Sequence, residues 1–323
     1  MSNTRLVLFL IVYTFFYSHP KSTFSQQNID CEILETERYL ILEQGTTYCR
    51  SVGNVEDPAI IFIGGFTTTC RVWDNTISAL CNLQIYMVSY DLYGFGDSDR
   101  PGGDYNKELF IGQLQGLIAA ERINKPFVII ASSMGATIAT MYACENPGEI
   151  DKLILLAPAG LKSRKPLLVK ILRTPYIGEL IARSLVKSKR FFRRAAGKFF
   201  SKDQIAQYAD VMYNQFQKEG TVEAVLSTFR NFPLDDACWA YEAVGNYNIP
   251  TYVIWGREDS IVPVTGAETL SDLIPNASIF IIDNAEHIIQ CNHPELVNEQ
   301  ISNILSTSGS KGTNFNKISN GGE

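Results

Sequence analysis

Residues 127–139 read FVIIASSMGATIA, and this stretch decides the fold. A run of apolar and β-branched residues, typical of a buried strand, leads at once into small residues and then into a helix-forming segment. A strand that reverses directly into a helix leaves room only for small side chains two positions before and two positions after the apex of the turn. With Ser133 at the apex, those positions hold alanine and glycine, whereas with Ser132 they would hold isoleucine and methionine. The pattern therefore places Ser133 at the apex.

Other apolar runs of strand length alternate with helical patterns on both sides of this turn. Residues 26–58 alternate polar and apolar positions, which predicts a β-hairpin at the edge of a sheet. Alternating strands and helices are typical of a mainly parallel sheet covered on both faces. We therefore predict an α/β fold with a mostly parallel, eight-stranded sheet, whose other strands are residues 59–63, 85–90, 153–157, 251–255 and 278–283.

A long segment with helical patterns but no strand pattern interrupts this alternation. We expect residues 161–247 to form a helical lid, inserted into a core domain made of residues 26–160 and 248–305. Residues 306–323 are rich in Gly, Ser, Asn and Lys, and this composition predicts a disordered tail.

The first 25 residues have the pattern of a secretory signal peptide. Arg5 precedes a twelve-residue apolar run, residues 6–17, and a polar stretch follows up to Ser25, near which we expect cleavage. A signal anchor is the alternative, but a bilayer-spanning helix needs about 20 apolar residues. The pattern favours a protein that is secreted or resides in the lumen of the secretory pathway.

All seven cysteines follow the signal segment, and in an oxidising compartment we expect some of them to form disulfides. The odd count leaves at least one outside such pairs, and the sequence does not indicate which. The chain has no C-x-x-C motif, so a zinc or redox site has no support. Asn276 begins the only N-x-S/T sequon, at an expected surface turn, and is the candidate for glycosylation.

Several segments, taken together, resemble the α/β-hydrolase superfamily over about residues 36–305. They match that superfamily's oxyanion loop, strand-4 loop, nucleophile turn, acid segment and histidine segment in the expected order. The resemblance implies a serine hydrolase of the esterase and lipase type, with Ser133 as the nucleophile. The matching segments are residues 64–66, 90–96, 131–135, 255–263 and 284–287.

The acid segment reads WGREDSIVP and is similar to the superfamily's W-G-x-x-D-x-x-V-P. This similarity implies Asp259 as the acid of the catalytic triad. Glu258 is the alternative, although it is one residue out of register. Asp91, Asp97 and Asp99 match a structural loop of the superfamily and receive no catalytic role.

The base can be chosen among only three histidines. His19 lies in the signal segment, and His293 precedes a proline at an expected helix start, where a polar residue can cap free N–H groups. His287 lies in N-A-E-H, which is similar to the superfamily's G-A-G-H. A serine hydrolase needs a base that accepts the hydroxyl proton and later returns it, and His287 is the candidate.

The resemblance also implies an oxyanion hole formed by the backbone N–H groups of Phe66 and Met134. The superfamily usually has His-Gly where this chain has Gly64-Gly65. The resemblance implies neither a metal nor an organic cofactor.

A serine at position 133, rather than an aspartate, favours acyl transfer to water through an acyl-enzyme. We therefore expect a serine hydrolase that cleaves small-molecule or lipid carboxylic esters. Hydrolysis of amides or of carbon–carbon bonds on the same triad is the alternative, as is a non-catalytic binding protein on a hydrolase scaffold.

The lid has an unexpected charge. Residues 162–202 contain thirteen Lys and Arg against one acid, Glu179, which gives +12 in a chain whose net charge is −6. Paired apolar residues recur within this basic segment, and the spacing suits helices with one apolar and one cationic face. The charges could simply be solvated, or the lid could settle on an anionic lipid surface. We expect no nucleic-acid partner.

Overall fold

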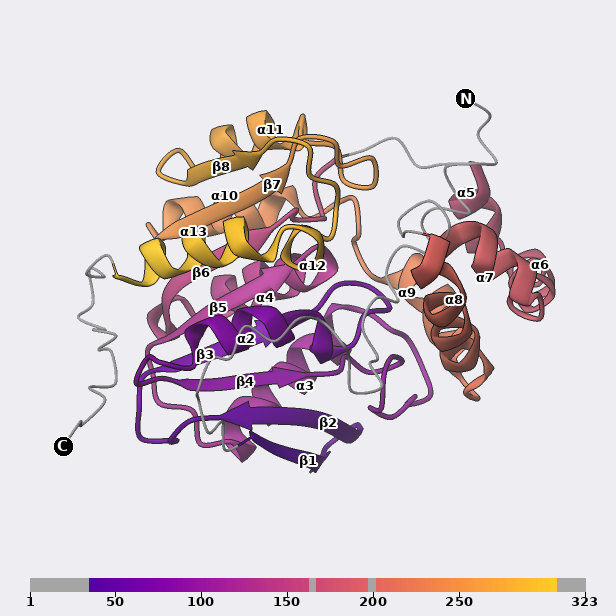
Figure 1. Ribbon diagram of the computed structural model, residues 1–323, viewed down its shortest axis with the longest axis horizontal. Helices are drawn as coiled ribbons and strands as arrows, with labels where there is room; N and C mark the ends of the chain where they lie inside the picture. The colour runs from indigo at the N-terminus through magenta and orange to yellow at the C-terminus, as the bar shows by residue number, and fades with distance from the viewer. Residues whose placement is uncertain (1–34, 163–166, 197–201, 307–323) are drawn as a thin grey trace.

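The computed structural model describes residues 35–162, 167–196 and 202–306. A sheet of eight strands runs through the core in the order β1-β2-β4-β3-β5-β6-β7-β8 (Figure 1). β1 and β2 pair antiparallel, β2 also pairs antiparallel with β4, and every other pair is parallel. The predicted fold class is therefore confirmed. The strands are β1 (Glu35–Leu42), β2 (Gly45–Val52), β3 (Ala59–Ile63), β4 (Tyr86–Tyr90), β5 (Phe127–Ser132), β6 (Ile150–Leu156), β7 (Thr251–Gly256) and β8 (Ser278–Ile282).

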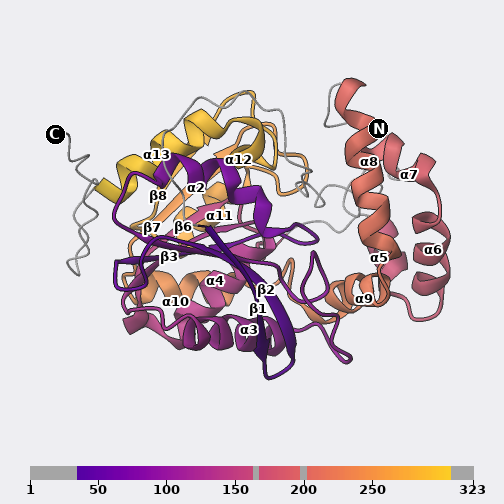
Figure 2. The ribbon, with the colours of Figure 1, turned by 60° about the horizontal axis from the view of Figure 1, so that its bottom comes forward.

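The central strands are continuously apolar because helices cover both faces of the sheet. Every residue of β3, β4, β5 and β6 is buried. The helices α3 (Lys107–Ala120), α4 (Met134–Glu145) and α10 (Cys238–Asn246) lie on one face, and α2 (Asp74–Leu80) and α13 (Pro294–Ser306) lie on the other (Figure 2). The carboxyl ends of β3, β5 and β7 therefore share one edge, where ligand sites of such sheets form.

Local sequence signals explain where the helices begin and end. The side chain of Asn106 caps α3 by accepting a hydrogen bond from the Leu109 N–H at 3.0 Å. α4 is buried from Met134 to Ala143, and its small residues allow it to pack between the sheet and α10. Four further short helices of the described residues belong to the core: η1 (Cys70–Trp73), η2 (Pro147–Glu149), α11 (Gly266–Leu273) and α12 (Ile289–Asn292).

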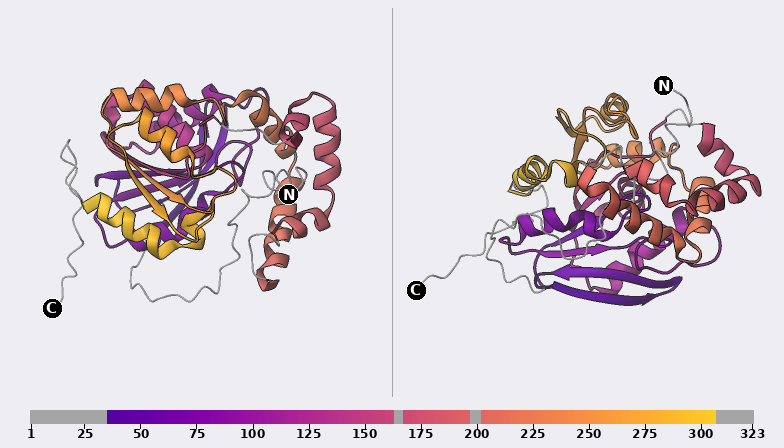
Figure 3. Two further views of the ribbon diagram at one scale, coloured as in Figure 1. Left: turned by 90° about the horizontal axis from the view of Figure 1, so that it is seen from above. Right: turned by 45° about the vertical axis from the view of Figure 1, so that its right-hand side comes forward.

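Between β6 and β7 the described residues form helices and no strand. We call α5 to α9 the insertion, and Figures 1 and 3 show it standing beside the sheet rather than over either face. α10 belongs to the core because it packs against α4. The insertion therefore ends earlier than the predicted lid boundary at residue 247. Its helices are α5 (Leu167–Arg173), α6 (Ile177–Val186), α7 (Lys189–Ala196), α8 (Lys202–Gln217) and α9 (Thr221–Asn231).

The expected disulfides are not found in the part of the chain that the structure describes. No disulfide joins any two of its six cysteines, which include Cys49 on β2, Cys144 on α4 and Cys291 in α12. Cys31, the signal segment 1–25 and residues 307–323 lie outside the described ranges. Within those ranges, no helix is long and apolar enough to cross a membrane.

Candidate active site

Ser133 lies at the apex between β5 and α4, as its register predicts. Its backbone has φ 52° and ψ −118°, a conformation that non-glycine residues rarely adopt and that is typical of strained functional positions. Two backbone hydrogen bonds hold it there: the Ser133 N–H donates to the Leu156 carbonyl at 2.9 Å, and the Ser133 carbonyl accepts from the Ala159 N–H at 3.1 Å. The neighbouring strand β6 and its loop therefore stabilise the turn.

The small residues around Ser133 are required by close backbone contacts. A Cβ atom on Gly135 would lie 2.3 Å from the Gly64 carbonyl oxygen, and one on Gly65 would lie 3.2 Å from the Ser133 Cβ. The glycine loop after β3 therefore passes directly against the serine turn. Because β3 and β5 are paired neighbours in the sheet, the fold itself brings these segments together.

His287 joins Ser133 to Asp259. Its Nε2 lies 3.0 Å from Ser133 Oγ, and its Nδ1 lies 2.6 Å from Asp259 Oδ2. All three side chains are buried, with 9, 4 and 5 % exposure for Ser133, His287 and Asp259. The structure thus brings together three predicted residues that come from the ends of β5, β7 and β8.

Backbone hydrogen bonds hold the carboxylate of Asp259 in place. Its second oxygen, Oδ1, accepts hydrogen bonds from the N–H groups of Ile261 at 2.8 Å and Val262 at 2.9 Å. The Trp255 indole N–H donates to the Val262 carbonyl at 2.8 Å and braces the same turn. Glu258, the alternative acid, is exposed, and its backbone N–H donates to the Ala285 carbonyl at 2.9 Å.

The acid and histidine loops lie in direct contact. A Cβ atom on Gly256 would lie 2.3 Å from the carbonyl oxygen of Glu286, next to the histidine. His293 is not part of this arrangement, because it directly precedes α13, where its carbonyl accepts from the Val297 N–H. The hydroxyl of Ser132, the neighbouring residue, lies 3.5 Å from Gln290 Nε2.

The predicted oxyanion donors flank Ser133. Met134 is the first residue of α4, so helix geometry leaves its N–H without an intrahelical acceptor. Phe66 follows the glycine pair, and no bond within the described residues uses its N–H. Thr68 fixes this loop, since its N–H and its hydroxyl both donate to the Gly65 carbonyl, at 3.3 and 2.9 Å. No sequence pattern singled out Thr68, and it occupies space that a side chain at Gly64 would need.

An aromatic cluster connects this loop to the insertion. The ring of Phe66 lies 5.4 Å from that of Phe95 and 4.9 Å from that of Phe229, between centroids. Phe229 belongs to α9 and is buried. The sequence could not reveal this pairing, because the two residues are far apart along the chain.

Asp91 supports the neighbouring loop. Its carboxylate accepts from the N–H groups of Cys70 at 2.6 Å and Asp97 at 2.8 Å. Burial raises the pKa of Asp91, although these backbone hydrogen bonds oppose the shift. Asp91 therefore holds the loop, in agreement with the role expected from its match to a structural motif.

The arrangement provides a hydroxyl, a base in hydrogen-bond contact with it, and an acid that orients the base. These groups lie beside two backbone N–H groups at the carboxyl edge of the sheet. Together they define a serine hydrolase. Within the described ranges, no group of three or more His, Cys, Asp or Glu residues is placed to hold a metal ion.

Comparison with known proteins agrees with this class. The family model for the alpha/beta hydrolase fold matches residues 58–294, and the chain belongs to this family. A monoacylglycerol lipase of Xenopus laevis, abhd6-B, is 25 % identical over 280 residues, covering 79 % of this chain and 78 % of the relative.

Solved structures share the fold. A putative lipase from Acinetobacter baumannii has a TM-score of 0.67 and 22 % identity, and the match covers 84 % of this chain and 91 % of that one. A 2-hydroxy-6-oxo-6-phenylhexa-2,4-dienoate hydrolase from Rhodococcus has a TM-score of 0.69 and 17 % identity, with 84 % and 98 % covered.

Proposed function

We propose that this protein hydrolyses carboxylic esters through an acyl-enzyme formed on Ser133. The observation that carries the proposal is the hydrogen-bonded chain from Ser133 Oγ through His287 to Asp259, with distances of 3.0 and 2.6 Å. Both distances suit direct proton transfer and orientation by hydrogen bonding.

The reaction then proceeds in two halves. As Ser133 Oγ attacks the ester carbonyl carbon, His287 Nε2 accepts the hydroxyl proton, and Asp259 orients and stabilises the imidazolium. The N–H groups of Phe66 and Met134 stabilise the negative charge on the carbonyl oxygen. His287 returns the proton to the departing alkoxide. A water molecule activated by His287 then attacks the acyl-enzyme and releases the acid.

We infer that the substrate is a lipid ester. The similarity to a monoacylglycerol lipase supports this class. We further propose that the cationic insertion attracts an anionic surface from which such a lipid is drawn.

A fluorophosphonate probe and p-nitrophenyl esters of increasing chain length test the proposal. We expect covalent labelling of Ser133 and turnover of the esters, with both lost in Ser133→Ala. Ser132→Ala is the matched control, because it removes a neighbouring buried hydroxyl, which lies 3.5 Å from Gln290 Nε2. If the probe labels Ser132, or labels nothing while the folded protein still cleaves esters, the assignment is wrong.

We also propose that the chain enters the secretory pathway through the signal segment 1–25 and is glycosylated at Asn276. The Asn276 side chain is exposed just before β8 and its turn is accessible to a glycan. Expression in a eukaryotic host should give a chain that starts near residue 26 and whose mass falls on treatment with N-glycosidase. Asn276→Gln should abolish that shift, and an intact first segment with no glycan would contradict the proposal.

A further inference from the structure

The outer helix of the insertion, α6, exposes large apolar side chains. Tyr176, Ile177 and Leu180 are 88, 52 and 74 % exposed. Ile177 and Leu180 lie about one helical turn apart and share a face, and Tyr176 directly precedes the helix. Figures 1 and 2 show α6 at the outer edge of the insertion, on the side away from the sheet. A patch of this kind at one edge is typical of an interaction surface.

The opposite side of the same helix is packed. Gly178, Ala182 and Val186 are buried against the rest of the insertion. A Cβ atom on Gly178 would lie 2.2 Å from the Leu172 carbonyl oxygen, so α5 and α6 are in close contact. The exposed apolar face is therefore presented by a helix that is already fully packed on its other side.

Tyr176 is held in an unusual backbone conformation. It precedes α6 with φ 63°, in the left-handed region that a tyrosine rarely adopts. Strain of this kind persists where the surroundings enforce it, and it clusters at functional positions. The result is that an amphipathic ring, the type found at membrane–water interfaces, projects almost fully into solvent.

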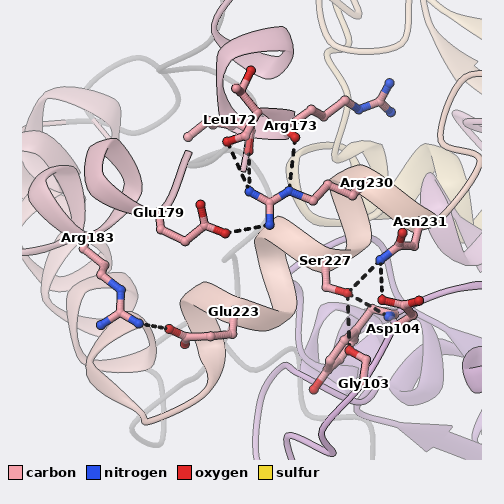
Figure 4. A network of polar contacts seen from close by, with 12 residues as sticks. Gly103, Asp104, Leu172, Arg173, Glu179, Arg183, Glu223, Ser227, Arg230 and Asn231 are labelled. Carbon is pink, nitrogen blue, oxygen red and sulfur yellow. Dashed lines mark hydrogen bonds and ion pairs between the residues drawn. The ribbon is translucent and has the colours of Figure 1, made fainter. Parts of the chain in front are cut away.

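Arg230 of α9 braces this edge (Figure 4). Its Nη1 donates to Glu179 Oε1 at 2.6 Å, and Glu179 is the single acid of residues 162–202. Its other nitrogens donate to three backbone carbonyls at the end of α5 and the start of the turn that leads to α6. These carbonyls belong to Leu172 at 3.3 Å, Arg173 at 3.2 Å and Thr174 at 3.4 Å. The turn that carries the exposed side chains is thus fixed to the rest of the protein.

Exposed cations follow these apolar residues along the chain, at the end of α6 and on α7. Lys187, Arg190, Arg193 and Arg194 are exposed, and none of them forms an ion pair within the described residues. Two nearby cations are paired: Arg183 with Glu223 at 2.6 Å and Lys189 with Asp210 at 3.1 Å. On α7 two cations precede and two follow the buried pair Phe191 and Phe192, so the phenylalanines face the interior and the cations stay exposed.

We propose that this edge inserts into the surface of an anionic lipid bilayer, with Tyr176, Ile177 and Leu180 in the interface and the cations against the headgroups. This proposal rests on the proposed function, because binding to a membrane would bring the active site close to lipid ester substrates. A nucleic acid or an acidic polysaccharide would use the cations but not three exposed apolar side chains. Both features together suit an anionic membrane surface.

Binding is measured with the full-length Ser133→Ala protein, so that hydrolysis does not change the vesicles. We expect co-sedimentation with phosphatidylcholine vesicles that contain phosphatidylserine, and weaker binding to phosphatidylcholine alone. Salt should reduce the difference by screening. Equal binding to both vesicles at low and high salt would overturn the electrostatic part of the proposal.

Two sets of variants test which residues contact the vesicle. All variants keep the first 34 residues unchanged, so a difference in vesicle binding between them comes from the substituted residues. Ile177→Ser/Leu180→Ser should weaken binding at least tenfold, because two apolar side chains no longer leave water. Arg190→Gln and Arg193→Gln should each weaken it about fivefold, equivalent to about 1 kcal/mol. The matched control is Ile41→Ser/Leu296→Ser, which removes an exposed isoleucine and leucine from β1 and α13. Equal losses in the control and the α6 variant would show that α6 is not the contact.

Activity on a soluble p-nitrophenyl ester separates this proposal from the proposed function. The α6 variant should keep that activity while losing vesicle binding. If the wild type binds vesicles but cleaves no ester, the proposed function is wrong and the surface stands. If the wild type cleaves the ester but binds no vesicle, the surface proposal is wrong. The surface proposal is also wrong if the protein binds heparin as well as it binds anionic vesicles and the substitutions at Ile177 and Leu180 change neither.

Discussion

The ring of Phe229 lies 4.9 Å from the ring of Phe66, and this contact joins the insertion to the loop proposed to stabilise the oxyanion. Arg230, the next residue, binds the turn between α5 and α6. One short helix, α9, therefore contacts both the outer edge of the insertion and the active-site loop. A movement of the insertion would therefore change the position of the Phe66 N–H through the adjacent side chains of Arg230 and Phe229.

Replacing Phe229 by leucine tests this connection. The change roughly conserves volume and should cost less than about 1.5 kcal/mol of stability. It removes the ring that packs on Phe66, so kcat should fall severalfold while KM changes little. Phe110→Leu is the control, since Phe110 is equally buried and packs on Phe232 rather than on Phe66. An equal fall in both variants would indicate a general packing effect.

Changing Asp259 to asparagine should lower kcat by about 10⁴-fold while leaving the fold intact, because the imidazole loses the partner that sets its tautomer. Glu258→Gln, one residue away and exposed, should leave kcat unchanged. Steady-state kinetics on a soluble ester would decide this, and a larger loss for Glu258→Gln would mean that the acid is misassigned.

Gly135→Ala should disrupt both the serine turn and the oxyanion loop. The added methyl group would lie 2.3 Å from the Gly64 carbonyl oxygen, which is backbone and cannot rotate away. We expect a lower melting temperature and a loss of fluorophosphonate labelling. Gly148→Ala is the control because no atom lies within 4 Å of its added Cβ, and it should behave as the wild type.

Buried thiols should resist alkylation in the native protein. Burial raises the pKa of Cys49 to about 12 and that of Cys144 to about 11. At pH 8 the reactive thiolate is then about one part in ten thousand and one part in a thousand, respectively, and it grows as pH rises. Mass spectrometry after iodoacetamide should show little labelling of either residue until urea is added. Rapid labelling of Cys144 in the native protein would contradict this.

The sequence predicts those parts of the fold whose environment is encoded locally. The strand expected at residues 59–63 is β3 (Ala59–Ile63), because a strand buried on both faces must be apolar throughout. The serine turn is equally clear, since backbone contact excludes all but small residues around Ser133. Asp259 and His287 are placed by motif, and the parallel sheet brings them within hydrogen-bond distance.

Features that depend on distant contacts could not be predicted. The helical pattern of α10 does not show that its apolar face covers α4 instead of belonging to the insertion. The contact between Phe66 and Phe229 and the bracing by Arg230 join residues far apart in the chain. Cysteine pairing could not be predicted either, because a cysteine count indicates a compartment but not which side chains are neighbours, and the six described cysteines form no disulfide.

The catalytic base, His287, follows an edge strand of the sheet. This strand, β8, is the last in the sheet order, and among the described strands it pairs only with β7. Most residues of β8 are only partly buried, whereas every residue of the central strands β3 to β6 is buried. Local opening of an outer strand needs far less free energy than unfolding of the whole domain. We therefore expect mild heating to separate the imidazole of His287 from the Ser133 hydroxyl, and so to abolish catalysis, before the central strands unfold.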